Sequence, residues 1–219
     1  MNYQAFWKFI QLLHDNDLLQ YVEVVGSWCE YLYAQSGYLP GFTASLRTLD
    51  VDFLIKSLKK PAKKANLSTI AAQNGYTIDH DYLTGTTKIY TPDLMEIEFL
   101  IEQKGAGTEA ALETNMGVAA QALHHMHILK EFSIDLNVFG MDITVPVPEA
   151  YVMHKIIINE QRGQKSEKDR QSIERLMPYL DKNRLEEIIG HLTKSERKAL
   201  AEYSRQYIHT DWNLNLSKS

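Results

Sequence analysis

The chain has 219 residues, of which 44% are hydrophobic, enough for one large or two small domains with an ordinary core. Its formal net charge of −5 argues against a protein that coats nucleic acid broadly, but leaves room for a local basic groove. No run of 18 apolar residues occurs, so we expect no membrane span. The single cysteine, Cys29, excludes an intramolecular disulfide and fits a reducing cytoplasm.

The first third of the chain predicts two helices and two strands. Apolar residues recur at helical spacing over residues 6–13, so we expect a packed helix there rather than a signal peptide. A strand near 21–25 leads to Gly26-Ser27 and then to a helix that runs to about residue 35. Residues 36–48 are rich in Gly, Pro, Ser and Thr and predict a loop before a strand at 49–55.

The rest of the chain changes character near residue 147. Pro61 can open a helix that Gly75 closes, and alternating segments near 76–90 and 94–101 predict strands. A hairpin is expected around Phe139-Gly140. The remaining segments all read as helices, at 149–161, 166–177, 182–191 and 194–208. We therefore predict an α/β domain over 1–147 and a helical region over 148–219.

Two of the predicted strands carry acids in pairs. Side chains at i and i+2 of a strand share a face, so Asp50 projects with Asp52, and Glu96 with Glu98. Carboxylate oxygens are ligands that Mg²⁺ or Mn²⁺ prefers. A glycine such as Gly26 lets backbone approach phosphate closely, and Ser27 with the next helix's first amides can donate to phosphate oxygens. These residues together predict a site for a divalent cation and a nucleoside triphosphate.

This order of motifs resembles the polymerase-beta-like nucleotidyltransferase superfamily. Its signature is a Gly-Ser turn, a strand with two acids, and a third acid on a later strand, matched here by Gly26-Ser27, Asp50-Val51-Asp52 and Glu98. Further stretches look like a bacterial branch of these proteins related to toxin–antitoxin and abortive-infection systems. They are residues 47–52, 145–151, 154–155, 161–162 and 165–169.

The resemblance implies a nucleotidyltransferase-like mixed sheet flanked by helices, followed by a helical region. It implies Mg²⁺-dependent transfer of a nucleoside monophosphate from a triphosphate, ATP included, to a hydroxyl acceptor, with release of pyrophosphate. The acceptor, a protein side chain, an RNA end or a small molecule, stays open, as do base preference and oligomeric state. By this resemblance Asp50, Asp52 and Glu98 would be catalytic and hold the metal, and the residues Gly26, Ser27, Lys155, Lys168 and Asp169 would border the nucleotide.

Several of these features also have plainer explanations. Glu96 is either a second ligand or a rim charge, and Ser166-x-x-Asp169 also matches a helix capping box. Lys155 would by default be a solvated lysine. The residues 124–127, His-His-Met-His, favour a polar cluster at the end of a segment over a zinc site, because no partner group follows at zinc spacing.

Two other functional classes remain open for the whole chain. The fold could serve as a catalytically weak nucleotide-binding module or an antitoxin-like interaction module. It could also be a structural α/β protein whose edge strand carries charge. The first would be expected to lose one of the three acids, and the second predicts no metal-dependent triphosphate binding.

Overall fold

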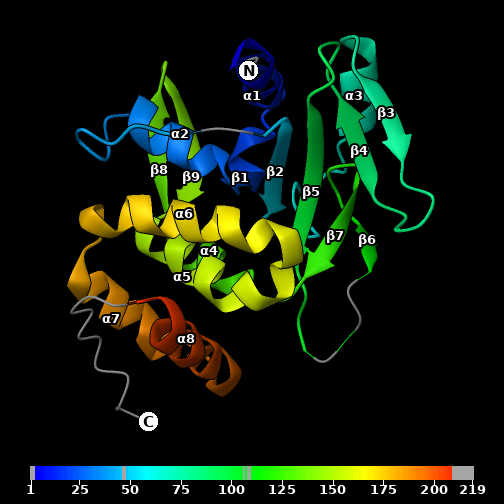
Figure 1. Cartoon of the computed structure of the whole chain (residues 1–219). Coiled ribbons are helices and arrows are strands. Elements are labelled where there is room, and N and C mark those ends of the chain that lie inside the picture. Colours follow the sequence, from blue (N-terminus) through cyan, green and yellow to red (C-terminus); the bar gives the residue numbers. More distant parts are fainter. Residues whose placement is uncertain (1–2, 46–47, 106, 108–109, 209–219) are drawn as a thin grey trace. The chain divides into compact units, whose positions relative to one another are not determined.

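The computed structural model describes residues 3–45, 48–105, 107 and 110–208. The chain forms two compact units, one made of Met1–Met126 and Ile134–Val145, the other of His127–Ser133 and Pro146–Ser219 (Figure 1). The second unit thus includes residues 127–133, which the sequence analysis assigned to the α/β domain over 1–147. The domain boundary near residue 147 stays a proposal. No helix in the described ranges has the length and apolar character needed to cross a membrane.

A mixed sheet is the framework of the first unit, with seven strands among the described residues. The strands are β1 (Val22–Val25), β2 (Asp50–Ile55), β3 (Thr77–His80), β4 (Thr87–Tyr90), β5 (Glu96–Glu102), β6 (Ala111–Glu113) and β7 (Ala119–Leu123). The order β1-β2-β5-β4-β3 forms the main path of the sheet, with β7 paired to β5 and β6 paired to β7. One edge of β5 pairs in parallel with β2, and β4 and β7 share the other edge (Figure 1).

Strand alternation separates an apolar face of the sheet from an acidic one. In β5, Ile97 and Phe99 are buried while the glutamates between and beside them are half-buried, as a period of two requires. The Phe99 ring stacks on Phe53 of β2 with 6.1 Å between centroids, and Phe53 lies 5.5 Å from Phe9 of α1 (Tyr3–Asp15). Helix α1 therefore covers the apolar face, and the acids of β2 and β5 stand on the opposite one.

A second helix, α2 (Trp28–Gln35), is anchored at the start of β2. The fully buried Trp28 stacks on Phe6 of α1, with 4.2 Å between ring centroids. Its indole Nε1 donates to the Asp50 carbonyl oxygen at 2.9 Å. This bond ties the first residue of α2 to the first residue of β2, so the turn before α2 has a fixed place beside the acidic strand.

The prediction that Pro61 opens a helix was wrong. The helix there, α3 (Leu67–Gln73), begins only after Asn66, whose side chain caps it by accepting from Thr69 N at 3.0 Å. The preceding loop is held instead by Asn115, whose amide donates to the Pro61 carbonyl at 3.1 Å. The short strands β6 and β7 were not predicted.

The predicted hairpin around Phe139-Gly140 is confirmed. Strands β8 (Ser133–Val138) and β9 (Met141–Pro146) flank it, and both turn residues have positive φ, 52° and 79°. Positive φ at both central positions is the pattern of a tight two-residue hairpin turn. The Phe139 ring lies 4.9 Å from the Trp7 ring of α1.

The second unit is helical, as the sequence predicts for its longer segment. Helix α5 (Pro148–Ile158) is buried along almost its whole length, which suits a helix enclosed by others. It is contacted by α4 (His127–Glu131), α6 (Ser166–Leu176), α7 (Lys182–His191) and α8 (Lys194–Tyr207). The predicted fold class, a mixed α/β sheet with a C-terminal helical region, is therefore confirmed. The remaining helices are η1 (Leu19–Tyr21) in the first unit, and η2 (Asn159–Lys165) and η3 (Met177–Tyr179) in the second.

Gly117 gives a test of the packing around α3. Its φ is +78°, and an added Cβ would lie 2.7 Å from the Ala65 carbonyl oxygen, whereas Gly140 has φ +79° with open space around it. Both alanine variants bear a left-handed backbone cost of about 1–2 kcal/mol, but Gly117→Ala adds a clash with backbone of about 1–3 kcal/mol. Urea unfolding should show Gly117→Ala as the less stable of the two. Equal loss in both variants would contradict the close approach of the 65–67 segment to Gly117.

Candidate active site

The strand register lines up the predicted acids in two rows across the sheet. In the parallel pairing of β2 with β5, Asp50 is the Cα partner of Glu96, and Asp52 is the partner of Glu98. Adjacent strands lie about 4.8 Å apart, and residues two positions along a strand lie about 6.6 Å apart. The backbone positions of four acidic residues therefore form the corners of a small rectangle, with their side chains on one face of the sheet.

The Gly26 turn abuts one corner of this rectangle. Val25 pairs with Asp52 in the antiparallel β1–β2 ladder, so the next residue, Gly26, follows directly beside that aspartate. Gly26 has φ +71°, and a Cβ built on it would come 2.6 Å from Asp52 Oδ2. The absence of a side chain at Gly26 thus leaves the space that the Asp52 carboxylate occupies, which the sequence did not reveal.

Ser27 stands at the first turn of α2 without capping the helix. Its backbone is helical, with φ −67° and ψ −16°, and its side chain makes no capping hydrogen bond. The Cys29 amide bonds to the Gly26 carbonyl at 3.2 Å, which starts the helix, and the buried Cys29 thiol donates to the Val24 carbonyl at 3.2 Å. The Ser27 hydroxyl therefore makes no capping hydrogen bond to the helix, which is compatible with the predicted donation to a phosphate oxygen.

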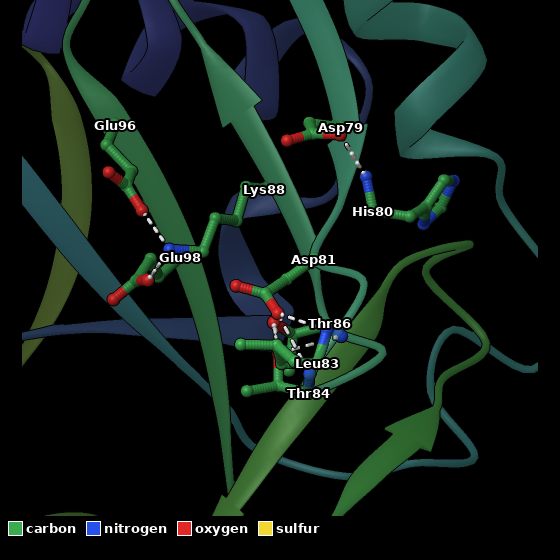
Figure 2. Close-up of polar contacts among 9 residues, drawn as sticks. All are labelled: Asp79, His80, Asp81, Leu83, Thr84, Thr86, Lys88, Glu96 and Glu98. Carbon is green, nitrogen blue, oxygen red and sulfur yellow. Dashed lines mark hydrogen bonds and ion pairs between the residues drawn. The ribbon is translucent and has the colours of Figure 1, made fainter.

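A lysine that the sequence reasoning missed lies on the same face. Lys88 of β4 is the Cα partner of Glu98, so the second row reads Lys88, Glu98, Asp52 across three strands. Its ammonium binds Glu98 Oε1 at 2.8 Å and also binds Glu96 Oε1 (Figure 2). The alternation in residues 87–90 could have placed Lys88 on a polar strand face, but the pairing of β4 with β5 is not written in the local sequence.

The two glutamates perturb the titration of their neighbours on β4. Hydrogen bonds to Glu96 and then to Glu98 raise the pKa of Lys88, against the opposing effect of burial, so this ammonium is charged at neutral pH. The pKa of Tyr90, the Cα partner of Glu96, is raised by burial first and by the Glu96 charge second. The Lys88 shift therefore reflects concentrated negative charge on this part of the sheet, which at Tyr90 only adds to the effect of burial.

The acidic residues suit a divalent cation because of their oxygen donors and their positions on adjacent strands. Carboxylate oxygens on adjacent strands in register are hard donors, and the Gly26 turn keeps a Cβ away from Asp52. Across the described ranges, however, no group of three or more His, Cys, Asp or Glu side chains is placed to hold a metal ion. The carboxylate of Glu98 is turned to Lys88, so a three-acid site needs Glu98 to change its direction.

The other predicted nucleotide-binding residues lie in the second unit. Lys155 of α5 is buried and binds Asp169 of α6, which also accepts from Arg162 Nε at 3.1 Å. The Lys155 ammonium lies 4.9 Å from the centre of the Tyr151 ring. Lys168 is exposed. Their contact with a triphosphate stays a prediction, but the default picture of Lys155 as a solvated lysine is wrong.

Asp169 does not cap its helix in the way a capping box requires. Helix α6 begins at Ser166, the residue before it is already helical, and the helix has no side-chain cap. The buried Asp169 carboxylate is used instead by Lys155 and Arg162, two charges that offset its burial.

Two other predicted features lie apart from the acidic rows. His124, His125 and Met126 form the turn between β7 and α4, and His127 begins α4, at the end of a segment as expected. Arg47, which contributed to the resemblance, lies outside the described residues, as does residue 46 of the predicted loop. The described part of that loop, 36–45 and residue 48, has no helix or strand.

Comparison with known sequences gives the class of the protein. The sequence matches the nucleotidyltransferase family over residues 5–196, so the chain belongs to this family. A search among curated proteins gave no match.

Solved structures are similar in fold at low sequence identity. The antibiotic-resistance factor ANT(2'')-Ia, solved in solution, is 12% identical over 92% of this chain and 96% of its own, with a TM-score of 0.52. An antigenic nucleotidyltransferase-like protein from Paracoccidioides brasiliensis is 16% identical over 84% and 79%, with a TM-score of 0.46. A tRNA nucleotidyltransferase, complexed with a primer tRNA and an ATP analog, is 14% identical over 85% and 57%, with a TM-score of 0.27. The likeness to ANT(2'')-Ia supports the fold alone.

Gly26 can be tested against a matched glycine. Gly37 has φ +73° with nothing near its Cβ position, so Gly26→Ala and Gly37→Ala share the same backbone cost. In Gly26→Ala the new methyl group also displaces the Asp52 carboxylate, so Mn²⁺ binding by calorimetry should weaken at least about tenfold, a cost of about 1.4 kcal/mol. Gly37→Ala should bind Mn²⁺ like the parent. Equal Mn²⁺ affinity in both variants would remove Gly26 from the site.

The buried ion pair of the second unit predicts a stability effect. Lys155→Ala leaves the buried Asp169 with the half-exposed Arg162 as its remaining cation, and breaking a buried pair costs about 3 kcal/mol. Lys168→Ala, at an exposed position of the next helix, should change the free energy of unfolding by less than about 0.5 kcal/mol. Urea unfolding measures both values. Wild-type stability in Lys155→Ala would show that the pair does not hold α5 to α6.

Proposed function

We propose that the protein is a Mg²⁺-dependent nucleotidyltransferase that moves a nucleoside monophosphate from a nucleoside triphosphate to a hydroxyl acceptor. The observation that carries the proposal is the register that brings Asp50 and Asp52 alongside Glu96 and Glu98, next to the Gly26 turn. Membership in the nucleotidyltransferase family supports the class of reaction. The metal, the acceptor and the roles of single residues are the proposed part.

The chain's own residues account for substrate binding. Asp50, Asp52 and Glu98 would hold the divalent cation, for which Mn²⁺ can substitute. When bound, the cation neutralises charge on the triphosphate and on the reacting phosphoryl group. Gly26 leaves room for the Asp52 carboxylate at the turn, and the Ser27 hydroxyl with the first amides of α2 would donate to phosphate oxygens. Lys155, Lys168 and Asp169 remain predicted contributors at the phosphate side.

The transfer itself needs one base and one leaving group. The acceptor oxygen forms a bond to the α-phosphorus while the bond from that phosphorus to the α–β bridging oxygen breaks. Pyrophosphate leaves with the bridging oxygen. The proton of the attacking hydroxyl passes to a Glu98 oxygen, which therefore has to reach the reacting group.

A catalytically weak nucleotide-binding module is the second candidate. One observation favours it: the Glu98 carboxylate is bound by Lys88 and is turned away from the aspartates. The two candidates differ in turnover. Incubation with each labelled triphosphate and Mg²⁺, with RNA and cell protein as acceptors, yields labelled product for an enzyme. For a binding module, the triphosphate stays bound to the protein intact and no pyrophosphate is released.

Asp50→Asn and Asp52→Asn test the site directly. Each variant loses a metal ligand, so triphosphate turnover should fall at least about 100-fold, equivalent to a loss of nearly 3 kcal/mol of transition-state stabilisation. Thermal unfolding of the metal-free variants should stay near that of the parent, because each substitution removes one of several clustered like charges. Asp142→Asn, at an exposed position of β9, is the matched control and should leave turnover unchanged. Strong destabilisation by both site variants would mean that the acids are structural.

A further inference from the structure

Lys88 is paired with two carboxylates of the neighbouring strand β5. Its ammonium binds both glutamates of β5 (Figure 2). The Lys88 side chain is only 21% exposed. Asp79 of β3 is its Cα partner on the other strand, and the charge of Lys88 helps to lower the pKa of Asp81, after the hydrogen bonds that Asp81 accepts from Thr84. A cation held this closely neutralises much of the charge that a metal ion would otherwise neutralise.

Glu98 stands between two possible partners. In its row it has Lys88 on the β4 side and Asp52 on the β2 side, one strand spacing away in each direction. The structure shows it bound to Lys88 through Oε1. Glu96 also uses Oε1 for Lys88, so the ammonium keeps one carboxylate if it gives up the other.

We propose that Lys88 is the resident counter-ion of Glu98, and that a divalent cation bound by Asp50 and Asp52 takes Glu98 from Lys88 by exchange. The inference rests on the proposed function, since it concerns the same three acids. Glu98 turns from the β4 side to the β2 side, and Lys88 stays with Glu96. A doubly charged ion attracts a hard carboxylate more strongly than one ammonium does.

The exchange also settles the two explanations that the sequence leaves open for Glu96. Glu96 is the anchor of Lys88 and not a ligand of the cation. It keeps the ammonium paired after Glu98 has turned away, so the exchange leaves no partly buried charge without a partner.

Mn²⁺ binding to the metal-free protein tests the exchange without any activity. Lys88→Met removes the competitor, so Mn²⁺ affinity by calorimetry should rise about two- to fivefold, the effect of losing one partly exposed ion pair. Lys88→Arg keeps the charge and should bind Mn²⁺ like the parent. Lys63→Met, at an exposed position, removes one positive charge elsewhere and should change the affinity little. Unchanged or weaker Mn²⁺ binding by Lys88→Met overturns the proposal.

The Glu98→Gln variant distinguishes two effects of Lys88 on Mn²⁺ binding. One is its ion pair with Glu98, and the other is electrostatic repulsion between its ammonium and the metal ion. If Lys88 acts by holding Glu98, adding Lys88→Met to Glu98→Gln should leave Mn²⁺ affinity unchanged. A gain equal to that in the parent background would show a simple field effect and overturn the exchange. Lys88→Gln serves as a second neutral variant, with thermal unfolding as the check that each protein is folded.

The same titrations tell the two proposals apart. If the parent binds Mn²⁺ and Asp52→Asn does not, while Lys88→Met has no effect, then the metal site stands and the exchange fails. If Asp52→Asn binds Mn²⁺ like the parent, or the parent binds none, then the metal site of the proposed function fails and the exchange fails with it.

A comparison of Glu96→Gln with Glu98→Gln tests the role of Glu96 with two variants that each remove one negative charge. The proposal requires that Glu98→Gln weakens Mn²⁺ binding much more than Glu96→Gln does. Equal weakening by the two variants overturns the role given to Glu96.

Discussion

The parallel register between β2 and β5 is the constraint on which the site depends, because it sets Asp52 beside Glu98 and Asp50 beside Glu96. Side chains alternate along a strand, so a shift of one residue would set each aspartate against an apolar residue of β5 and divide the acids between the two faces. The stacked rings of Phe53 and Phe99 on the opposite face fix this register, since the same shift would carry one ring out of the core. The core on one face thus holds the carboxylates together on the other.

Clustered carboxylates repel one another, and the first unit offsets the repulsion locally. Lys88 binds Glu96 and Glu98, and the indole of Trp28 ties α2 to the backbone of Asp50. The Gly26 turn gives space to the Asp52 side chain. Lys88 neutralises the part of the acidic face near β4, while Asp52 lies against the Gly26 turn near the start of α2. Under the proposed function, the triphosphate with its metal ion would bind beside Asp52 and this turn.

The sequence predicts the parts of the fold that depend on local pattern. The alternation in β5, the hairpin at Phe139-Gly140 and the presence of a helix after Val147 follow from side-chain period and turn residues, although the burial of that helix was not predicted. Local pattern failed at Pro61, because tertiary bonds from Asn115 hold that loop and delay the helix to Leu67. It could not find Lys88 either, since the partner of a strand residue is set by pairing and not by neighbours in sequence. Likewise, the buried pair of Lys155 with Asp169 joins two helices that the sequence treats separately.

The most direct test of the account is a crystal structure of the protein with Mn²⁺ and a non-hydrolysable triphosphate analogue, in which anomalous scattering locates the metal. The account predicts Mn²⁺ in contact with Asp50, Asp52 and Glu98, with the triphosphate at Gly26-Ser27. Manganese bound away from these aspartates, or a triphosphate bound without any metal on them, would contradict it.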